Sequence, residues 1–236
     1  SDIRRSHAVG DPRVQDSYSL RCAPQVHGAV LDRLAEARRV VEIEMRSVTD
    51  NPLIVGGRVI SGGNFHGQAL SFAFDSAAGA MTALANMSER RSFQLTAAAA
   101  PRLKAFLAAD PGVESGYMIA QYAAAALASE NKTLAHPASA DSVPTSANKE
   151  DFVSMGMWSA LKFKRVVWNA AQVAAIELVC AAQAIEFHRP LRSGRGVERA
   201  LAILRSQVKA SRGDEVLSGK LETAREMILS GAFEED

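Results

Sequence analysis

The longest regular pattern in the sequence runs from Glu150 to about Phe187. Across this stretch, apolar side chains recur every three or four residues, the spacing of one face of a helix. They are Val167, Ala171, Ala174, Leu178, Ala182 and Ile185. The pattern predicts one unbroken helix that starts near Glu150 and ends at Arg189-Pro190. A helix of this length exceeds the width of a small domain, so it favours the core of an oligomeric helix bundle.

The rest of the chain also favours helices, since alanine is abundant and aromatic residues make up only 6% of the sequence. Apolar stripes predict further helices at about 26–45, 67–96, 117–133, 197–208 and 221–229. The alanine-rich 117–133 segment carries almost no charge before Glu130, so we expect it to be buried nearly all round. Leu53 to Ile60, with Gly56-Gly57 in its middle, has room for one small hairpin. We predict an all-α fold with two helices of about 30 residues or more, formed by residues 1–236 without an internal boundary.

Composition excludes several classes of partner. Lys and Arg number 27 against 26 Asp and Glu, so no net field attracts nucleic acid or an anionic membrane. No apolar run approaches the roughly 18 to 20 residues of a membrane span. Cys22 and Cys180 lie far apart and outside any metal-ligand spacing, which predicts a protein of the reducing cytoplasm without a disulfide or a metal. Ser1 to Arg13 forms a polar lead-in, which we interpret as an internal segment of a longer chain.

One concentration of polar groups precedes the first long helix. It reads Gln15-Asp16-Ser17-Tyr18-Ser19-Leu20-Arg21. If this segment is helical, Tyr18 and Arg21 share a face at a spacing of three residues. A guanidinium grips a carboxylate with two parallel hydrogen bonds, so Arg21 is a candidate ligand for a carboxylate. The alternative is a surface turn that leads into a helix.

Three later segments carry further candidates. The turn Ser61-Gly62-Gly63-Asn64-Phe65-His66-Gly67 lacks the glycine patterns of phosphate sites, so it is either a tight turn or part of another site. Glu130 follows a run of apolar residues, so it is paired, emerges into solvent near Lys132, or belongs to a site. In the loop 145–151, Ser146 and Asn148 are candidate caps of the longest helix, and Glu150 suits its positive N-terminus.

Taken together and in this order, these motifs resemble the aromatic amino-acid ammonia-lyase family, and within it the histidine-type enzymes. The motifs are Gln15-Asp16-x-Tyr18-Ser19-Leu20-Arg21, Asp50-Asn51-Pro52-Leu53, Ser61-Gly62-Gly63-Asn64-Phe65-His66, Ser88-Glu89-Arg90-Arg91, Ala128-Ser129-Glu130-Asn131-Lys132 and Glu150-Asp151-x-Val153-Ser154-Met155. The resemblance covers essentially the whole chain and is weakest after Pro190. The combination of motifs is highly specific.

This resemblance implies a long-helix bundle of the ammonia-lyase/fumarase superfamily type. It also implies a homotetramer in which several subunits build each active site. The implied reaction is the non-oxidative loss of ammonia from L-histidine to give trans-urocanate. Because the β-proton of the substrate is not acidic, the family uses an electrophile, the 4-methylidene-imidazol-5-one group, made autocatalytically from an Ala-Ser-Gly triplet.

The resemblance also implies roles for individual residues. Tyr18 and Gln15 would be catalytic residues that border the electrophile and the departing amine. Arg21 would bind the substrate carboxylate, and Phe65 would pack beside the electrophile. Glu130 would hold the imidazole ring, and Glu150 would belong to the substrate-binding set.

The chain departs from the family pattern in two respects. It contains no Ala-Ser-Gly triplet, because the family carries this triplet and a loop tyrosine base well upstream. The chain therefore resembles the C-terminal part of such an enzyme, and we predict that it is inactive without an N-terminal partner. The second departure lies at 148–153, where histidine-type enzymes usually read Asn-Gln-Glu-Asp-His-Val. This chain has Lys149 in place of the Gln and Phe152 in place of the His.

These departures leave alternative functions open. A phenylalanine- or tyrosine-type ammonia-lyase, or an aminomutase, is one of them. Glu130 favours an imidazole, because a carboxylate that faces an unsubstituted ring would be an uncompensated buried charge. The fumarase or argininosuccinate-lyase type is disfavoured, since Asp50-Asn51-Pro52 lacks the preceding Ser-Ser-x-Met-Pro signature. The remaining alternative is an inactive helical oligomerisation fragment.

Overall fold

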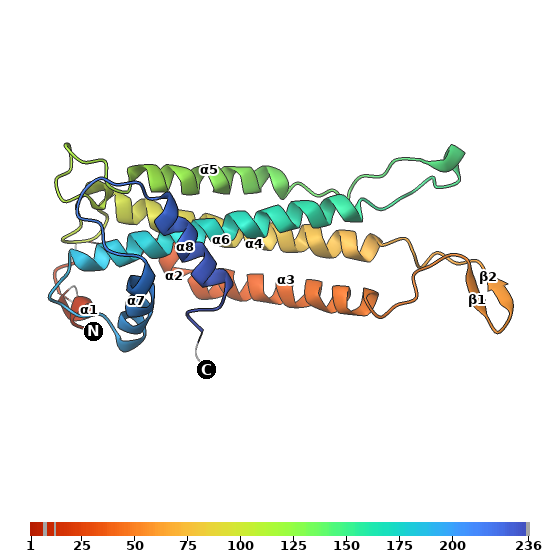
Figure 1. Cartoon of the computed structure of the whole chain (residues 1–236), viewed down its shortest axis with the longest axis horizontal. Helices are drawn as coiled ribbons and strands as arrows, with labels where there is room; N and C mark the ends of the chain where they lie inside the picture. The colour runs from red at the N-terminus through yellow and green to blue at the C-terminus, as the bar shows by residue number, and fades with distance from the viewer. Residues whose placement is uncertain (7–8, 12, 235–236) are drawn as a thin grey trace. The chain divides into compact units, whose positions relative to one another are not determined.

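Helices dominate the structure, as the sequence predicts. The computed structural model describes residues 1–6, 9–11 and 13–234, and this part holds eight α-helices and one hairpin (Figure 1). The elements are α1 (Asp2–Ser6), α2 (Tyr18–Arg21), α3 (Ala23–Glu44), β1 (Leu53–Val55), β2 (Arg58–Ile60), α4 (Gln68–Thr96), α5 (Met118–Leu134), α6 (Gly156–Glu186), α7 (Arg195–Gln207) and α8 (Ser218–Leu229). Single 3-10 turns occupy Ala105–Leu107 and Ser146–Asn148. Part of the predicted polar lead-in forms α1, whereas residues 7–8 and 12 lie outside the described residues.

The chain packs as two compact units. Unit 1 comprises Ser1–Pro24, Ala85–Ser129 and Asn169–Asp236, and unit 2 comprises Gln25–Leu84 and Glu130–Trp168. The helices α3, α4, α5 and α6 contribute residues to both units, α3 only its first two residues to unit 1. The prediction of one domain without an internal boundary stays a prediction.

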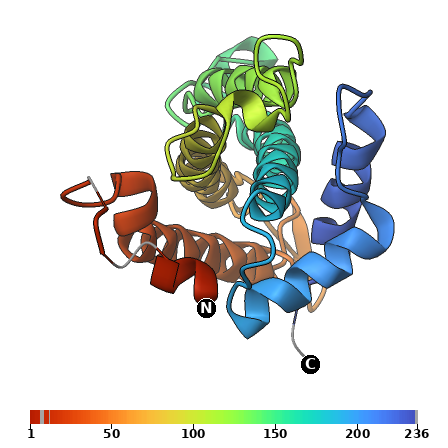
Figure 2. The same ribbon diagram turned by 90° about the vertical axis from the view of Figure 1, so that its left-hand side faces the viewer.

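In unit 1, the helices α5, α6, α7 and α8 share one apolar core. Its buried members include Ala120, Ala124, Val173, Ile176, Val179, Cys180, Leu201, Leu204, Leu221, Ala224 and Met227. The alanines let neighbouring helices approach closely, while the branched side chains fill the space between them. The helices α7 and α8 contact each other, and Figure 2 shows both in blue. This core surrounds the C-terminal half of α6, which is the part of the long helix that the apolar pattern marked most clearly.

In unit 2, α3, α4 and α6 meet around a smaller apolar cluster. Ala37, Ala73 and Ala77 are buried there, and the rings of Phe74 and Phe163 stack with centroids 6.0 Å apart. Polar contacts join α4 and α6 beside this cluster. The hydroxyls of Ser71 and Ser159 share a hydrogen bond of 2.9 Å, and Lys162 Nζ lies 3.3 Å from Asp75 Oδ1. Polar contacts as well as apolar ones therefore join the two helices.

The predicted hairpin is confirmed. The strands β1 and β2 pair antiparallel, with Leu53 opposite Ile60 and Val55 opposite Arg58. The two residues that join them, Gly56 and Gly57, have φ values of +57° and +76°. Two successive positive φ angles define the tight turn that matches the twist of a hairpin, and glycine adopts them without a steric penalty.

The two long helices are confirmed, but the predicted start of the longer one is wrong. The helix α4 has 29 residues and α6 has 31, and α6 begins at Gly156 and not near Glu150. Residues Ser146, Ala147 and Asn148 have φ values between +50° and +66°. A right-handed helix cannot continue through this left-handed backbone, so Ser146 and Asn148 do not cap α6. Glu150 instead closes a local turn, because its backbone pairs with Thr145.

The burial of α5 also differs from the prediction. Only one face of the helix is buried, at Ala120, Ala124, Ala128 and Asn131, whereas Ile119 and Tyr122 are about 60% exposed. The sequence predicts that α5 is in apolar contact on every side, but within a single copy of the chain only one side of α5 is covered.

The helix α6 is unusually apolar as well as long. Among the described residues, it is the one helix that is long and apolar enough to cross a membrane, with a mean hydropathy of 1.3 over an 18-residue window. The sequence prediction that no segment approaches a membrane span overlooked this helix. Of that window, 61% is buried inside the protein, which is typical of the core helix of a bundle.

Candidate active site

The short helix α2 brings Gln15, Tyr18 and Arg21 together in unit 1. Tyr18 and Arg21 are one helical turn apart, and the Arg21 guanidinium carbon lies 4.9 Å from the centroid of the Tyr18 ring. Arg21 also donates a hydrogen bond from Nη1 to the side-chain oxygen of Gln15. Tyr18 is 67% exposed, so the three side chains form an open polar surface. The prediction that Tyr18 and Arg21 share a helix face is confirmed.

Glu130 lies in the last part of α5 and is paired with α6 in unit 2. Its carboxylate accepts hydrogen bonds from Arg165 Nε at 3.0 Å and from Arg165 Nη2 at 3.3 Å. The local interpretation named Lys132 as a partner, and the structure supplies Arg165, which lies 35 residues further along the chain. Hydrogen bonding to Glu130 raises the pKa of Arg165. Both side chains are partly exposed, so Glu130 presents its carboxylate at the surface of unit 2.

The glycine-rich turn at 61–67 contacts the loop that precedes α6, also within unit 2. Nε2 of His66 donates a hydrogen bond to the carbonyl oxygen of Phe152 at 3.0 Å, and the two rings stack at a centroid distance of 5.7 Å. Ser154 Oγ donates to the carbonyl oxygen of His66 at 2.6 Å. Gly67 is the position in this turn that favours glycine, since its φ is +73°. Phe65 is 54% exposed.

Glu150 is held by its own loop. Its carboxylate accepts hydrogen bonds from the hydroxyls of Thr145 and Ser146, the latter at 2.9 Å. These two hydrogen bonds lower the pKa of Glu150. Glu150 therefore stays ionised and exposed in unit 2, together with Phe65 and Glu130, whereas Gln15, Tyr18 and Arg21 belong to unit 1.

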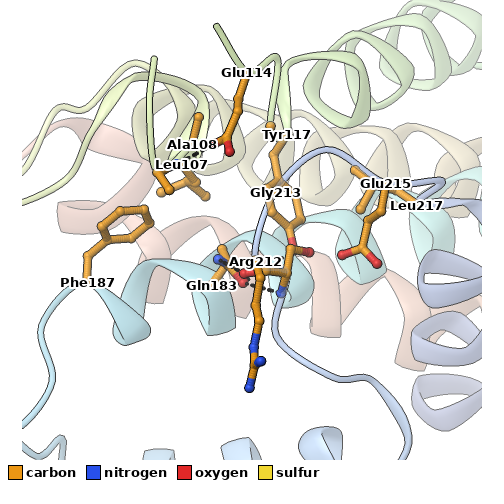
Figure 3. A pocket seen from close by; sticks show the side chains of 13 residues that line it. Leu107, Ala108, Glu114, Tyr117, Gln183, Phe187, Arg212, Gly213, Glu215 and Leu217 are labelled. Atoms are coloured by element: carbon orange, nitrogen blue, oxygen red, sulfur yellow. Dashed lines mark hydrogen bonds between the residues drawn. The ribbon is translucent and has the colours of Figure 1, made fainter.

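The small enclosed pocket in unit 1 is not a substrate site. Its volume is about 30 Å³, which suits a water molecule and is far below the size of an amino-acid site. Figure 3 shows Tyr117 and Gln183 at its centre, while the guanidinium of Arg212 points away. The hydroxyls of Tyr117 and Ser211 share a hydrogen bond of 2.7 Å, and burial raises the pKa of Tyr117. This polar contact fixes the segment between α7 and α8.

The two cysteines are free thiols, and Cys22 is partly buried while Cys180 is buried. Burial raises the pKa of Cys180 to about 12, so its reactive thiolate form is disfavoured. No group of three His, Cys, Asp or Glu side chains that could hold a metal ion occurs in the part of the chain that the structure describes.

Comparison with known proteins agrees with this fold. The sequence profile of the family described as aromatic amino acid lyase matches residues 1–206. The chain belongs to this family.

Within the family, the chain is similar to histidine ammonia-lyases. It is 51% identical to the histidine ammonia-lyase of Deinococcus radiodurans over 98% of this chain and 44% of the relative. The crystal structure of the histidine ammonia-lyase from Trypanosoma cruzi matches with a TM-score of 0.89 and 43% identity, over 93% of this chain and 44% of that one. A tyrosine aminomutase from Streptomyces globisporus matches with a TM-score of 0.87 and 36% identity, over 98% and 45%. The chain thus spans less than half the length of these relatives.

Proposed function

We propose that the chain supplies the substrate-binding part of a histidine ammonia-lyase, which eliminates ammonia from L-histidine to give trans-urocanate. In this reaction the Cα–N bond and a Cβ–H bond break, and a carbon–carbon double bond forms. The observation that carries the proposal is the contact of Arg21 with both Tyr18, on α2, and Gln15, just ahead of α2. The similarity to histidine ammonia-lyases over 98% of the chain supports it.

Each candidate residue has a task that its chemistry allows. Arg21 binds the α-carboxylate of the substrate with two parallel hydrogen bonds. Tyr18 and Gln15 offer a phenol and an amide to the departing amine. Glu130 accepts a hydrogen bond from the imidazole N–H, and Arg165 orients this carboxylate. Two further residues complete the substrate-binding set. Phe65 offers an apolar ring, and Glu150 offers a second carboxylate.

The residues on and just ahead of α2 also fit the group that the family uses. The exposed phenol of Tyr18 and the amide of Gln15 can donate hydrogen bonds to a 4-methylidene-imidazol-5-one, and they would border it. When bound, that group supplies an electrophile, which makes loss of the weakly acidic β-proton feasible. It derives from an Ala-Ser-Gly triplet that this sequence does not contain.

The partners and the cellular location follow the same proposal. The chain joins an N-terminal part that bears the electrophile, and the complete enzyme forms a homotetramer in the cytoplasm. The exposed apolar side chains on α5 and α6, such as Ile119, Trp158 and Leu161, support association with other polypeptides.

We expect the purified 236-residue chain to form no trans-urocanate from L-histidine, because no triplet in it can become the electrophile. The appearance of urocanate absorbance is measured with the chain alone and again after addition of an N-terminal part. Activity only in the mixture supports the proposal. Activity of the chain alone contradicts the assignment of the electrophile, and a lack of activity in both favours an inactive oligomerisation fragment.

We expect Glu130→Gln in the reassembled enzyme to lower kcat/KM for histidine by roughly ten- to a hundredfold and to narrow its preference for histidine over phenylalanine. The change removes a charge-assisted hydrogen bond to the imidazole, worth about 1.5–3 kcal/mol. Arg21→Lys should lower kcat/KM for histidine and for phenylalanine by a similar factor, because both substrates carry the same α-carboxylate.

The matched control is Glu36→Gln. Glu36 is also paired with an arginine, Arg39, at 2.7 Å and is similarly exposed, but it lies outside the candidate site. This variant should leave the ratio of kcat/KM for histidine to kcat/KM for phenylalanine unchanged. An unchanged histidine-to-phenylalanine ratio in Glu130→Gln would mean that another residue recognises the ring. Phenylalanine- and tyrosine-type lyases and aminomutases would then gain support, and Lys149 and Phe152 would be the next residues to exchange.

A further inference from the structure

The helix α2 is too short to hold its own position. It has four residues, and the side chain of Ser17 at its N-terminus makes no capping hydrogen bond. Isolated helices of this length are unstable, because nucleation fixes several residues for one hydrogen bond. Ser19 is its one buried residue, whereas Tyr18 and Leu20 are 67% and 46% exposed. Contacts with other parts of unit 1 must therefore fix the orientation of α2.

Two side chains of α4 make these contacts. Arg91 Nη1 donates a hydrogen bond to the carbonyl oxygen of Ser19 at 3.1 Å. Gln94 Nε2 donates to the hydroxyl oxygens of Ser17 at 2.7 Å and of Ser19 at 2.9 Å. Arg91 and Gln94 are three residues apart, so they lie on one face of α4 and reach the same turn.

Arg91 is itself fixed by α6. Its guanidinium forms a two-pronged pair with the Glu177 carboxylate, from Nε to Oε1 and from Nη2 to Oε2 at 2.8 Å. The side chains of Arg91 and Glu177 are only 16% and 23% exposed. A planar guanidinium held at two nitrogen atoms has little freedom, so its third nitrogen meets the Ser19 carbonyl in one geometry.

We propose that Arg91, Gln94 and Glu177 are positioning residues that hold α2 so that Tyr18 and Arg21 face the substrate. The inference rests on the function proposed for α2 and extends it to residues that do not touch substrate. Arg91 acts through the backbone of Ser19, the residue between Tyr18 and Leu20. A loosened α2 would present Arg21 and Tyr18 in many orientations, and small misplacements of such groups reduce rates strongly.

The first test measures α2 directly in the 236-residue chain. Arg91→Lys keeps a positive charge beside Glu177 but loses the planar fork. Hydrogen exchange is followed at the amides of Leu20, Arg21 and Cys22, which are bonded to the carbonyl oxygens of Ser17 and Tyr18. We expect exchange at these amides to become about tenfold faster or more. Unchanged exchange would overturn the proposal.

The matched control is Arg205→Lys. Arg205 also pairs with a glutamate of α6, Glu186, at 3.1 Å, and it donates to a backbone carbonyl, that of Val208, at 3.1 Å. Its side chain is 18% exposed, close to the value for Arg91. This variant loses the same kind of contacts without touching α2, so the α2 amides should keep their exchange rates. Equal acceleration in both variants would indicate general loosening and overturn the inference.

A second variant tests the proposal in case Arg91→Lys does not fold. Gln94→Met removes both hydrogen bonds to the serine hydroxyls and leaves the pair of Arg91 with Glu177 intact. It should also accelerate exchange at the α2 amides, by less than Arg91→Lys. If Arg91→Lys does not fold, wild-type exchange rates in Gln94→Met would overturn the proposal.

The second test measures catalysis in the reassembled enzyme with a double-mutant cycle. Arg91→Lys should lower kcat/KM for histidine by at least tenfold. If Arg91 acts through α2, adding Arg91→Lys to Arg21→Lys should lower kcat/KM by much less than it does in the wild type. Full additivity would show an effect unrelated to α2 and would overturn the inference.

The two tests separate this inference from the proposed function. If Arg21→Lys impairs turnover but Arg91→Lys leaves α2 unchanged, the proposed function stands and the positioning role fails. If α2 loosens in Arg91→Lys and neither variant affects turnover, α2 is not part of the site, and both the proposed function of α2 and the positioning role fail.

Discussion

Replacing Lys162 with methionine should lower the free energy of unfolding of the 236-residue chain by about 3–5 kcal/mol. Lys162 of α6 and Asp75 of α4 form an ion pair whose side chains are only 5% and 6% exposed. Asp75 also accepts the backbone N–H of Ser139 at 2.6 Å, and Lys162 donates to the carbonyl oxygen of His136. Methionine fills a similar volume but leaves the carboxylate buried without its counter-charge. Urea unfolding followed by circular dichroism measures the loss.

The matched control is Arg165→Met, three residues further along α6. Arg165 also pairs with a carboxylate, that of Glu130, but the two side chains are 52% and 39% exposed. Because solvent screens such a pair, we expect a loss of less than about 1 kcal/mol. The double variant Lys162→Met with Asp75→Leu should recover much of the stability, since it leaves no buried charge. Equal losses in Lys162→Met and Arg165→Met would show that burial does not decide the strength of these pairs.

The pH dependence of the Lys162→Met effect gives a further check. Burial tends to raise the pKa of Asp75, but the Ser139 N–H and Lys162 outweigh it, so the pKa lies below its ordinary value of 3.8. A lowered pKa in the folded state means that the ionised form stabilises the fold. This contribution is complete above pH 3.8 and is lost as the pH falls through the lower folded-state pKa. The difference between wild type and Lys162→Met should therefore shrink in that acidic range.

Gly116→Ala should destabilise the chain by about 2–4 kcal/mol. Gly116 precedes α5 with a φ of +52°, and a Cβ there would lie 2.5 Å from the carbonyl oxygen of Phe106. That oxygen accepts the backbone N–H of Tyr117 at 2.8 Å, so it cannot retreat without losing a hydrogen bond. The effect combines left-handed backbone strain with a collision against backbone. Thermal or urea unfolding of the variant measures it.

Gly56→Ala separates these two causes. Gly56 has nearly the same φ, +57°, but no other atom lies within 4 Å of the position where a Cβ would be. We expect only the conformational part of the loss, about 1–2 kcal/mol. If both variants lose the same stability, the contact with Phe106 has no measurable effect.

Local patterns were sufficient for most of the secondary structure. Apolar stripes predicted α3, α4, α7 and α8 to within a few residues, because the spacing of apolar side chains reflects which face of a helix is buried. Gly56-Gly57 predicted the hairpin, because a two-residue turn has its own backbone requirement. Both signals lie within a few residues of the structure that they specify.

The start of α6 could not be predicted in the same way. Glu150 and the serine and asparagine before it have the composition of a helix N-terminus. The structure places Ser146 to Asn148 in left-handed backbone and bonds Glu150 to Thr145 and Ser146. The same polar side chains can close a turn or cap a helix, and contacts outside the segment decide between the two.

The candidate site shows the same division between local and distant information. The order of motifs along the sequence was enough to indicate the family and to point to Gln15, Tyr18, Arg21 and Glu130. Sequence spacing also placed Tyr18 beside Arg21, since the two are one helical turn apart. It gave no sign that Arg165 pairs with Glu130 or that Arg91 holds Ser19, because these partners are 35 and 72 residues apart in the chain.

The sequence by itself thus determined the helices, the hairpin and the family, because periodicity and short motifs are properties of neighbouring residues. Only the tertiary structure decided which charges neutralise one another and what holds α2 in place. A hydrogen bond or ion pair between distant segments forms only when packing brings the donor and acceptor atoms to within about 3 Å of each other. No local spacing in the sequence encodes that distance. The partners of Glu130, Ser19 and Asp75 are consequences of packing.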